Sequence, residues 1–194
     1  MDATEKRMTW DDLVAIPVDW PCERYELFDG KLVITPLPTI PHQIAAADVA
    51  FPLAQVIRDH NLGEAFPVPI GVRFTPDNVV VPDAAFVARH RKHVIGPEVI
   101  DAAPDLIIEV VETTTRERDT TVKRAMYARF GVQEYWIVDA EERTVVILAL
   151  VGECYDRVEA DADGAFHSRA IPGFSMTTAT TFAGIEKIWG SSWP

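Results

Sequence analysis

Two runs of apolar residues dominate the middle of the chain, over residues 79–87 and 105–111. In both runs apolar side chains occupy odd and even positions alike, which is typical of strands covered on both faces of a sheet. Asp83 lies inside the first run, and Glu109 lies near the end of the second. Because an unpaired carboxylate is costly to remove from water, both acids need a partner such as a basic side chain or a metal ion.

A helical pattern follows the second run, over about residues 117–130. Its apolar positions recur at helical spacing and predict the buried face: Val122, Ala125, Met126 and Phe130. Asp119, Lys123 and Tyr127 are four residues apart and form the neighbouring stripe. That stripe either faces a cleft or carries an ordinary ion pair on a solvated surface.

An N-terminal β-hairpin is the clearest local prediction, because two apolar segments over residues 24–34 flank Asp29-Gly30, a dipeptide favoured in two-residue turns. In this register Glu26 shares a face with Phe28 and Val33. Glu26 is therefore either an exposed hairpin carboxylate or a side chain that points toward a site.

The other predicted elements complete an α/β pattern. A helix is expected over about residues 42–60, with a kink or break at Pro52, since proline removes a backbone hydrogen bond. The segment after Pro172 is expected to be irregular. Further strands are expected over residues 64–74, 134–139, 144–150, 154–158 and 165–171.

Two features could hold phosphate groups. His42, in the first turn of the predicted helix, either is a surface residue or approaches a site. Residues 89–93 form a cluster in which every side chain is basic or titratable, including Arg89, Arg91 and Lys92. This cluster either contacts phosphates beside the site or is a solvated loop.

Composition bounds these interpretations. The chain has 194 residues with 48% hydrophobic and 25% charged residues, which suits one soluble domain over residues 1–194. No signal peptide or membrane span is predicted, so we expect a cytoplasmic protein in which Cys22 and Cys154 are idle thiols rather than a disulfide. The net charge of −12 argues against a general nucleic-acid binder, although a local basic strip could still contact DNA.

Several motifs taken together resemble the Uma-type restriction endonuclease family, within the PD-(D/E)XK nuclease superfamily. The motifs are Tyr25-Glu26-Leu27-Phe28-Asp29-Gly30, Pro41-His42-Gln43, Val81-Pro82-Asp83, Pro104-Asp105-Leu106-Ile107-Ile108-Glu109-Val110, the Asp119/Lys123/Tyr127 stripe and residues 131–139. The resemblance covers roughly residues 8–183 and leaves residues 184–194 as a tail. It implies a restriction-endonuclease-like core, in which a mixed β-sheet is flanked by helices.

The resemblance also implies a metal site. Asp83 and Glu109 would be the metal carboxylates, and Mg²⁺ or Mn²⁺ the cofactor, because Mg²⁺ prefers one or two carboxylates plus waters and phosphate oxygens. Glu26 would be an additional acid of the site. The superfamily's lysine normally lies two residues after the second acid, where this chain has Val111, so Lys123 of the following helix would supply the ammonium. Supporting roles fall to three further residues: Tyr127, Asp119 and His42.

We therefore expect a metal-dependent endonuclease that hydrolyses DNA phosphodiester bonds, acting as a homodimer by analogy with nucleases of this fold. Two alternatives stay open. One is a non-catalytic DNA- or protein-binding module on the same fold, favoured by Val111 and the acidic charge. The other is a metal-dependent hydrolase acting on something other than DNA.

Overall fold

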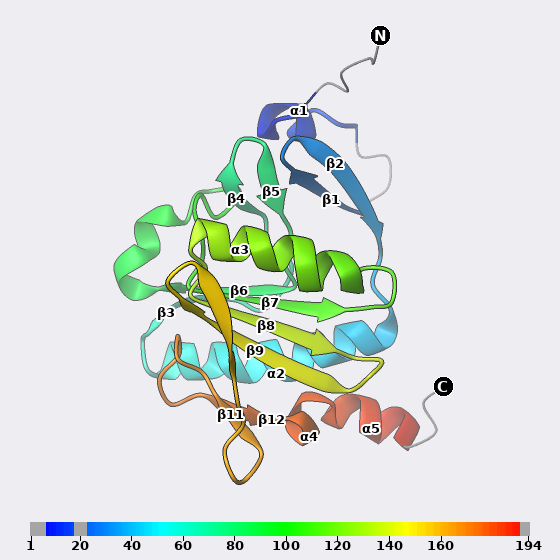
Figure 1. Cartoon of the computed structure of the whole chain (residues 1–194), viewed down its shortest axis with the longest axis vertical. Coiled ribbons are helices and arrows are strands. Elements are labelled where there is room, and N and C mark those ends of the chain that lie inside the picture. The colour runs from blue at the N-terminus through cyan, green and yellow to red at the C-terminus, as the bar shows by residue number, and fades with distance from the viewer. Residues whose placement is uncertain (1–6, 18–22, 191–194) are drawn as a thin grey trace.

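The computed structural model describes residues 7–17 and 23–190, and its centre is a mixed six-stranded β-sheet (Figure 1). In spatial order the strands are β10 (Cys154–Val158), β9 (Thr144–Val151), β8 (Glu134–Asp139), β7 (Leu106–Val111), β6 (Ala84–Ala88) and β3 (Gly63–Phe66). Neighbouring strands are antiparallel except β7 and β8, which are parallel. Parallel neighbours need a crossover connection, and a helical segment between β7 and β8 supplies it.

Helices cover both faces of this sheet (Figure 1). One face packs against α2 (Ile40–Asp59), α5 (Ala183–Trp189) and the short elements β11 (Ala165–His167), β12 (Ser175–Thr177) and α4 (Thr178–Thr181). The other face packs against a π-helical turn, η2 (Arg118–Lys123), that continues into α3 (Arg124–Phe130). All residues of β7 and β8 are buried, which confirms the predicted sheet flanked by helices.

A second, four-stranded antiparallel sheet lies above the first in the view of Figure 1, in the order β2 (Lys31–Pro36), β1 (Glu23–Phe28), β5 (Asn78–Val80) and β4 (Val72–Thr75). The predicted hairpin is confirmed, with Glu26 opposite Val33 and Leu27 opposite Leu32. Asp29 and Gly30 both have positive φ, at 48° and 79°, as the tight turn between these strands requires.

The apolar run over residues 79–87 forms two strands rather than the one that we predicted. β5 ends at Val80 in the small sheet, and β6 begins at Ala84 in the large one. At the crossing, Pro82 has no backbone N–H to pair, and the N–H of Val81 donates to the Glu26 carboxylate. Apolar patterning cannot reveal such a change of sheet, because both strands are buried.

Two predictions of local structure need correction. α2 continues through Pro52, because buried residues on both sides of the proline, including Val49 and Leu53, hold the helix against the sheet. The basic cluster forms a 3₁₀ helix, η1 (Arg89–Val94), rather than a loop. A short N-terminal helix, α1 (Trp10–Val14), has Thr9 at its N-cap position.

The segment after Pro172 is ordered into β12, α4 and α5 instead of being irregular. Ile185 of α5 is fully buried against the core that α2 forms with the sheet. No helix in the described ranges is long and apolar enough to cross a bilayer. Cys154 is a free, exposed thiol, while Cys22 lies outside the described residues.

Candidate functional site

Asp83 lies at the crossing between the two sheets. Because Ala84 pairs with Ile108 in the antiparallel β6–β7 ladder, Asp83 is the residue opposite Glu109 on the adjoining strand. Its Oδ2 atom accepts a 2.7 Å hydrogen bond from the N–H of Val110. Its Oδ1 atom lies 2.6 Å from Arg24 Nη2 and 2.9 Å from His42 Nε2.

These partners keep Asp83 ionised. Burial alone would raise the pKa of the Asp83 carboxyl, but the hydrogen bond from His42 and the charge of Arg24 outweigh burial. The pKa of Asp83 is therefore lowered below its ordinary value. Arg24 lies two residues before Glu26 on the same face of β1, so strand periodicity could have indicated this partner before the structure did.

Glu109 alternates along β7 with Ile107 and Val111, so its side chain points to the sheet face covered by η2 and α3. Its Oε1 atom lies 2.8 Å from Lys123 Nζ and accepts a 2.6 Å hydrogen bond from the Tyr127 hydroxyl. Burial raises the pKa of Glu109 to about 8, in spite of the opposing charge of Lys123. In the metal-free protein the Glu109 carboxyl therefore holds its proton more tightly than an exposed glutamate does.

The ammonium of Lys123 is the centre of the site. Its Nζ atom contacts Glu109 at 2.8 Å, Glu26 at 2.9 Å and Asp119 at 3.5 Å, with Lys123 itself only 2% exposed. Burial alone would lower the pKa of Lys123, but the charges of Glu109, Glu26 and Asp119 outweigh burial and raise it. The structure therefore brings together all four residues that the sequence proposed as catalytic: Asp83, Glu109, Lys123 and Glu26.

The helix that carries Lys123 is turned differently from our prediction. Asp119, Lys123 and Tyr127 are buried, whereas Val122 is 48% exposed and Ala125 is also exposed. The helix has this orientation because the acids on the facing strands can be buried only with a cation beside them. Of the four apolar residues that we expected to be buried, Met126 is buried and Phe130 is partly so.

His42 is buried, so its surface interpretation is wrong, as is the exposed one for Glu26. Thr39 caps the N-terminus of α2, and its N–H and hydroxyl donate to Glu112 Oε1 at 2.8 and 2.6 Å. The same Glu112 oxygen lies 3.8 Å from His42 Nδ1. Glu112 thereby joins α2 to the end of β7 beside the site.

A small cavity of about 20 Å³ lies among these groups. Four side chains of its lining each have a buried polar atom without a hydrogen-bond partner in the part of the chain described. They are Thr35, His42, Arg118 and Asp119. Buried polar atoms are normally paired, so four such atoms at one cavity indicate a place built for a polar guest. Sequence reasoning did not single out Thr35 or Arg118, because neither residue belongs to a recognisable motif.

The basic cluster of η1 does not line this cavity. It follows the last residue of β6, whereas Asp83 precedes the first. Arg91 donates to Asp105 and to the carbonyl of Ala103, and Lys92 pairs with Glu64 at 2.5 Å. The structure gives these two residues structural partners, and Arg89 lies in the same 3₁₀ helix.

The charges at the cavity suit a divalent cation. Asp83 and the cavity lining together contain five acidic residues, and the lining contains three basic ones, Arg24, Arg118 and Lys123. With all of these ionised and His42 neutral, the cluster has a net charge of −2. The described residues contain no group of three His, Cys, Asp or Glu side chains arranged to hold a metal by themselves. Asp83 and Glu109 alone match the one or two carboxylates that Mg²⁺ takes from a protein when water and phosphate complete its shell.

Comparisons with known proteins agree with this fold. A crystal structure described as "a putative nuclease belonging to DUF820", from Anabaena variabilis ATCC 29413, is similar with a TM-score of 0.74 and 19% sequence identity, over 91% of this chain and 98% of that one. A comparison with curated proteins found no match. The model of the Uma2 family, described as "Putative restriction endonuclease", matches residues 10–179. The chain therefore belongs to the Uma2 family.

Proposed function

We propose that this protein is a metal-dependent endonuclease that hydrolyses DNA phosphodiester bonds. One observation carries the proposal: Asp83 and Glu109 face each other on adjoining strands, and Lys123 Nζ lies 2.8 Å from Glu109. Membership of a family described as restriction endonucleases supports a nuclease activity. DNA as substrate and Mg²⁺ or Mn²⁺ as cofactor are parts of the proposal.

In this mechanism Asp83 and Glu109 hold the cation, which when bound supplies Lewis acidity toward the scissile phosphate. Arg24 and His42 fix the Asp83 carboxylate in one orientation through its Oδ1 atom. Tyr127 does the same for Glu109 through Oε1. Fixed ligands lower the reorganisation that the reaction requires.

Lys123 takes the role that the superfamily gives to a lysine two residues after the second acid. That position is Val111, which is buried in the apolar core and has no charge. The ammonium of Lys123 instead reaches the same carboxylate from η2. Only the location of the ammonium matters for orienting water or stabilising negative charge in the transition state, so the relocation preserves the chemistry.

The test is cleavage of plasmid and single-stranded DNA by purified protein with Mg²⁺ or Mn²⁺, beside Asp83→Asn, Glu109→Gln and Lys123→Met. We expect each substitution to lower the cleavage rate by about 100-fold or more. Asp105→Asn is the matched control. Asp105 is a buried acid that directly precedes β7, at the end of this strand away from Glu109, and it accepts hydrogen bonds from the Ala88 N–H and from Arg91.

The outcomes separate the three interpretations. Metal-dependent cleavage that survives Asp105→Asn but is lost in the site variants supports the endonuclease. DNA binding without cleavage in any metal indicates the non-catalytic module. A metal-loaded protein that neither binds nor cleaves DNA indicates a hydrolase of another substrate.

A further inference from the structure

The cavity beside Lys123 contains hydrogen-bond donors without acceptors. Arg118 Nε and the Thr35 hydroxyl are both buried and unpartnered in the described part of the chain. The ion pairs of Arg118 are long, 3.8 Å to Glu26 and 3.7 Å to Asp119, which exceeds hydrogen-bond distance. Arg118 is thus held near the acids while its Nε–H has no acceptor among the described residues.

Arg24 adds further donors at the same cavity. A guanidinium carries five N–H groups, and the contact with Asp83 engages the Nη2 atom. The side chains of Arg24 and Arg118 are 17% and 21% exposed, so both extend from the cavity wall to solvent. Both arginines line the same cavity, and each guanidinium presents a planar fork of donors suited to phosphate oxygens.

The acceptor atoms at the cavity have a different use. His42 Nε2 contacts the Asp83 carboxylate and donates to it, so in the neutral ring Nδ1 is an acceptor. Asp119 Oδ1 is an acceptor as well. These two atoms can bind the hydrogens of water, while the arginines and Thr35 require an acceptor such as an anion.

The size of the cavity identifies what can enter. Its volume of about 20 Å³ is enough for one water-sized group. A single phosphate oxygen is of that size, whereas a base or a sugar is far larger. In a nucleic acid such an oxygen belongs to the backbone phosphate, so a contact with it would carry no sequence information.

We propose that this cavity is a subsite for one non-bridging oxygen of a backbone phosphate, with Arg24, Arg118 and the Thr35 hydroxyl as its donors. The inference rests on the proposed nuclease function and extends it, because it assigns phosphate positioning to β1, β2 and η2. In a protein with a net charge of −12, the two arginines supply individual positive charges at the cavity mouth, although the cavity cluster as a whole stays acidic. The basic residues of η1 have no part in it.

The test measures binding of a short fluorescent DNA duplex in Ca²⁺ over a range of salt concentrations, under conditions in which the DNA stays uncut. We expect Arg118→Gln and Arg24→Gln each to weaken binding about tenfold or more at fixed salt. Each should also lower the slope of log Kd against log salt concentration by about 0.9, the value for one lost phosphate contact.

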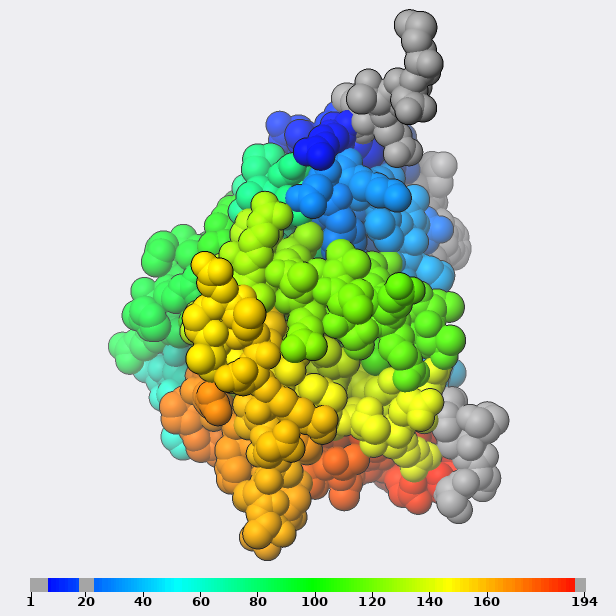
Figure 2. Space-filling model, viewed as in Figure 1, coloured from blue at the N-terminus to red at the C-terminus, as the bar shows by residue number. Residues whose placement is uncertain are grey.

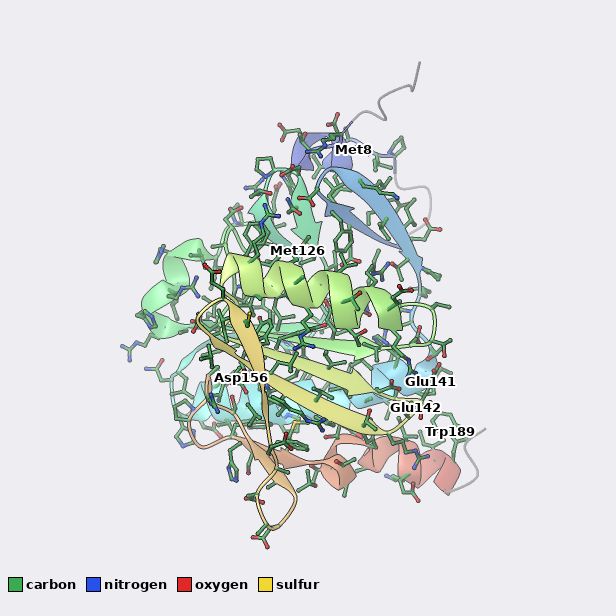
Figure 3. All side chains as sticks on the ribbon, viewed as in Figure 1. Met8, Met126, Glu141, Glu142, Asp156 and Trp189 are labelled. Carbon is green, nitrogen blue, oxygen red and sulfur yellow. The ribbon has the colours of Figure 1, made fainter. Side chains whose placement is uncertain are left out.

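Two further variants keep the result interpretable. Arg116→Gln is the matched control: Arg116 lies two residues before Arg118 but pairs with Asp139 at 2.7 Å and with Glu141, which follows β8 at the end of the sheet (Figure 3). Thr35→Val removes a donor without removing charge, so it should weaken binding while leaving the salt slope unchanged. Circular dichroism checks that each variant is folded.

Calorimetric titration of Ca²⁺ without DNA separates failure of this inference from failure of the proposed function. If Ca²⁺ and DNA bind and Arg118→Gln behaves like Arg116→Gln, with Thr35→Val unchanged, the phosphate subsite is wrong and the nuclease proposal stands. If neither Ca²⁺ nor DNA binds, both are wrong. Loss of DNA affinity and salt slope in Arg118→Gln but not in Arg116→Gln, with Ca²⁺ binding intact, supports the subsite.

Discussion

Lys123 brings a positive charge into the interior, where it meets Glu109 at 2.8 Å and Glu26 at 2.9 Å. Removing one partner of a buried ion pair leaves the other charge uncompensated, which costs more than the pair contributes. The metal-free protein therefore depends on Lys123 for stability.

We expect Lys123→Met to lower the free energy of unfolding of the metal-free protein by about 3–5 kcal/mol. Addition of Mg²⁺ or Mn²⁺ should restore part of this loss, because a cation bound to Asp83 and Glu109 replaces the missing charge. Urea denaturation with and without metal measures both effects. Lys92→Met is the control, since the Lys92–Glu64 pair is about half exposed; an equal loss there would contradict the argument.

The raised pKa of Glu109 predicts a pH dependence. A carboxyl whose pKa is about 8 in the folded protein and 4.5 otherwise contributes stability that is present below pH 4.5 and is lost as the pH rises through about 8. Without metal, the wild type should therefore lose stability relative to Glu109→Gln as the pH rises from 4.5 to about 8. Melting temperatures of the two proteins across this pH range measure the loss. A difference between the two proteins that is independent of pH would contradict this assignment.

Among individual residues, the sequence predicted the acids better than their environment. Asp83, Glu109 and Glu26 stand out because each is a carboxylate among apolar neighbours. Arg118 and Thr35 have no such contrast with their surroundings, and only the folded chain shows where their donors lie. Val122 was predicted to be buried because hydrophobicity alone oriented the helix, whereas buried ion pairs decide its orientation and leave Val122 exposed.

At the scale of elements, η2 and α3 lie between the hairpin strands and the β9–β10 strands in the space-filling view (Figure 2). This position lets one helical segment carry side chains to both sheets: Lys123 contacts Glu26 of β1 and Glu109 of β7. The βαβ arrangement of β7, α3 and β8 was predictable from two buried strands with a helix between them. The division of residues 79–87 between two sheets was not, because hydrophobicity is the same on both sides of Asp83.

α2 offers a test of how packing overrides local preference. Pro52 is exposed and lies inside the helix between buried Val49 and Leu53. Because Ala restores the missing N–H and removes the ring, Pro52→Ala should raise the free energy of unfolding by about 1–3 kcal/mol. Thermal denaturation beside Gln55→Ala, an exposed substitution in the same helix, measures it. A lower melting temperature for Pro52→Ala would show that the ring contributes packing instead.

At the scale of the whole molecule, the core reaches beyond the residues that resemble the family. α5 begins at Ala183, and its Ile185 is 0% exposed, packed with the residues of α2 and the large sheet. The expected single domain therefore should include α5, although the family model ends at residue 179.

Ile185→Ala tests this extent. We expect it to lower the free energy of unfolding by about 2–5 kcal/mol through the cavity that it leaves. Ile188→Ala in the same helix should change it by less than about 0.5 kcal/mol, since Ile188 is 58% exposed. Both proteins should unfold in one cooperative transition by circular dichroism and by tryptophan fluorescence. Two separate transitions would contradict the single domain.

The short crossing at residues 81–83 links the two sheets and sets the geometry between them. Arg24 and Glu26 belong to the small sheet, while Glu109 belongs to the large one. Since side chains alternate along a strand, a single residue inserted before Ala84 would send Asp83 to the opposite face of the chain and away from Glu109. The three-residue crossing therefore has a fixed length, because an insertion there would separate the two carboxylates.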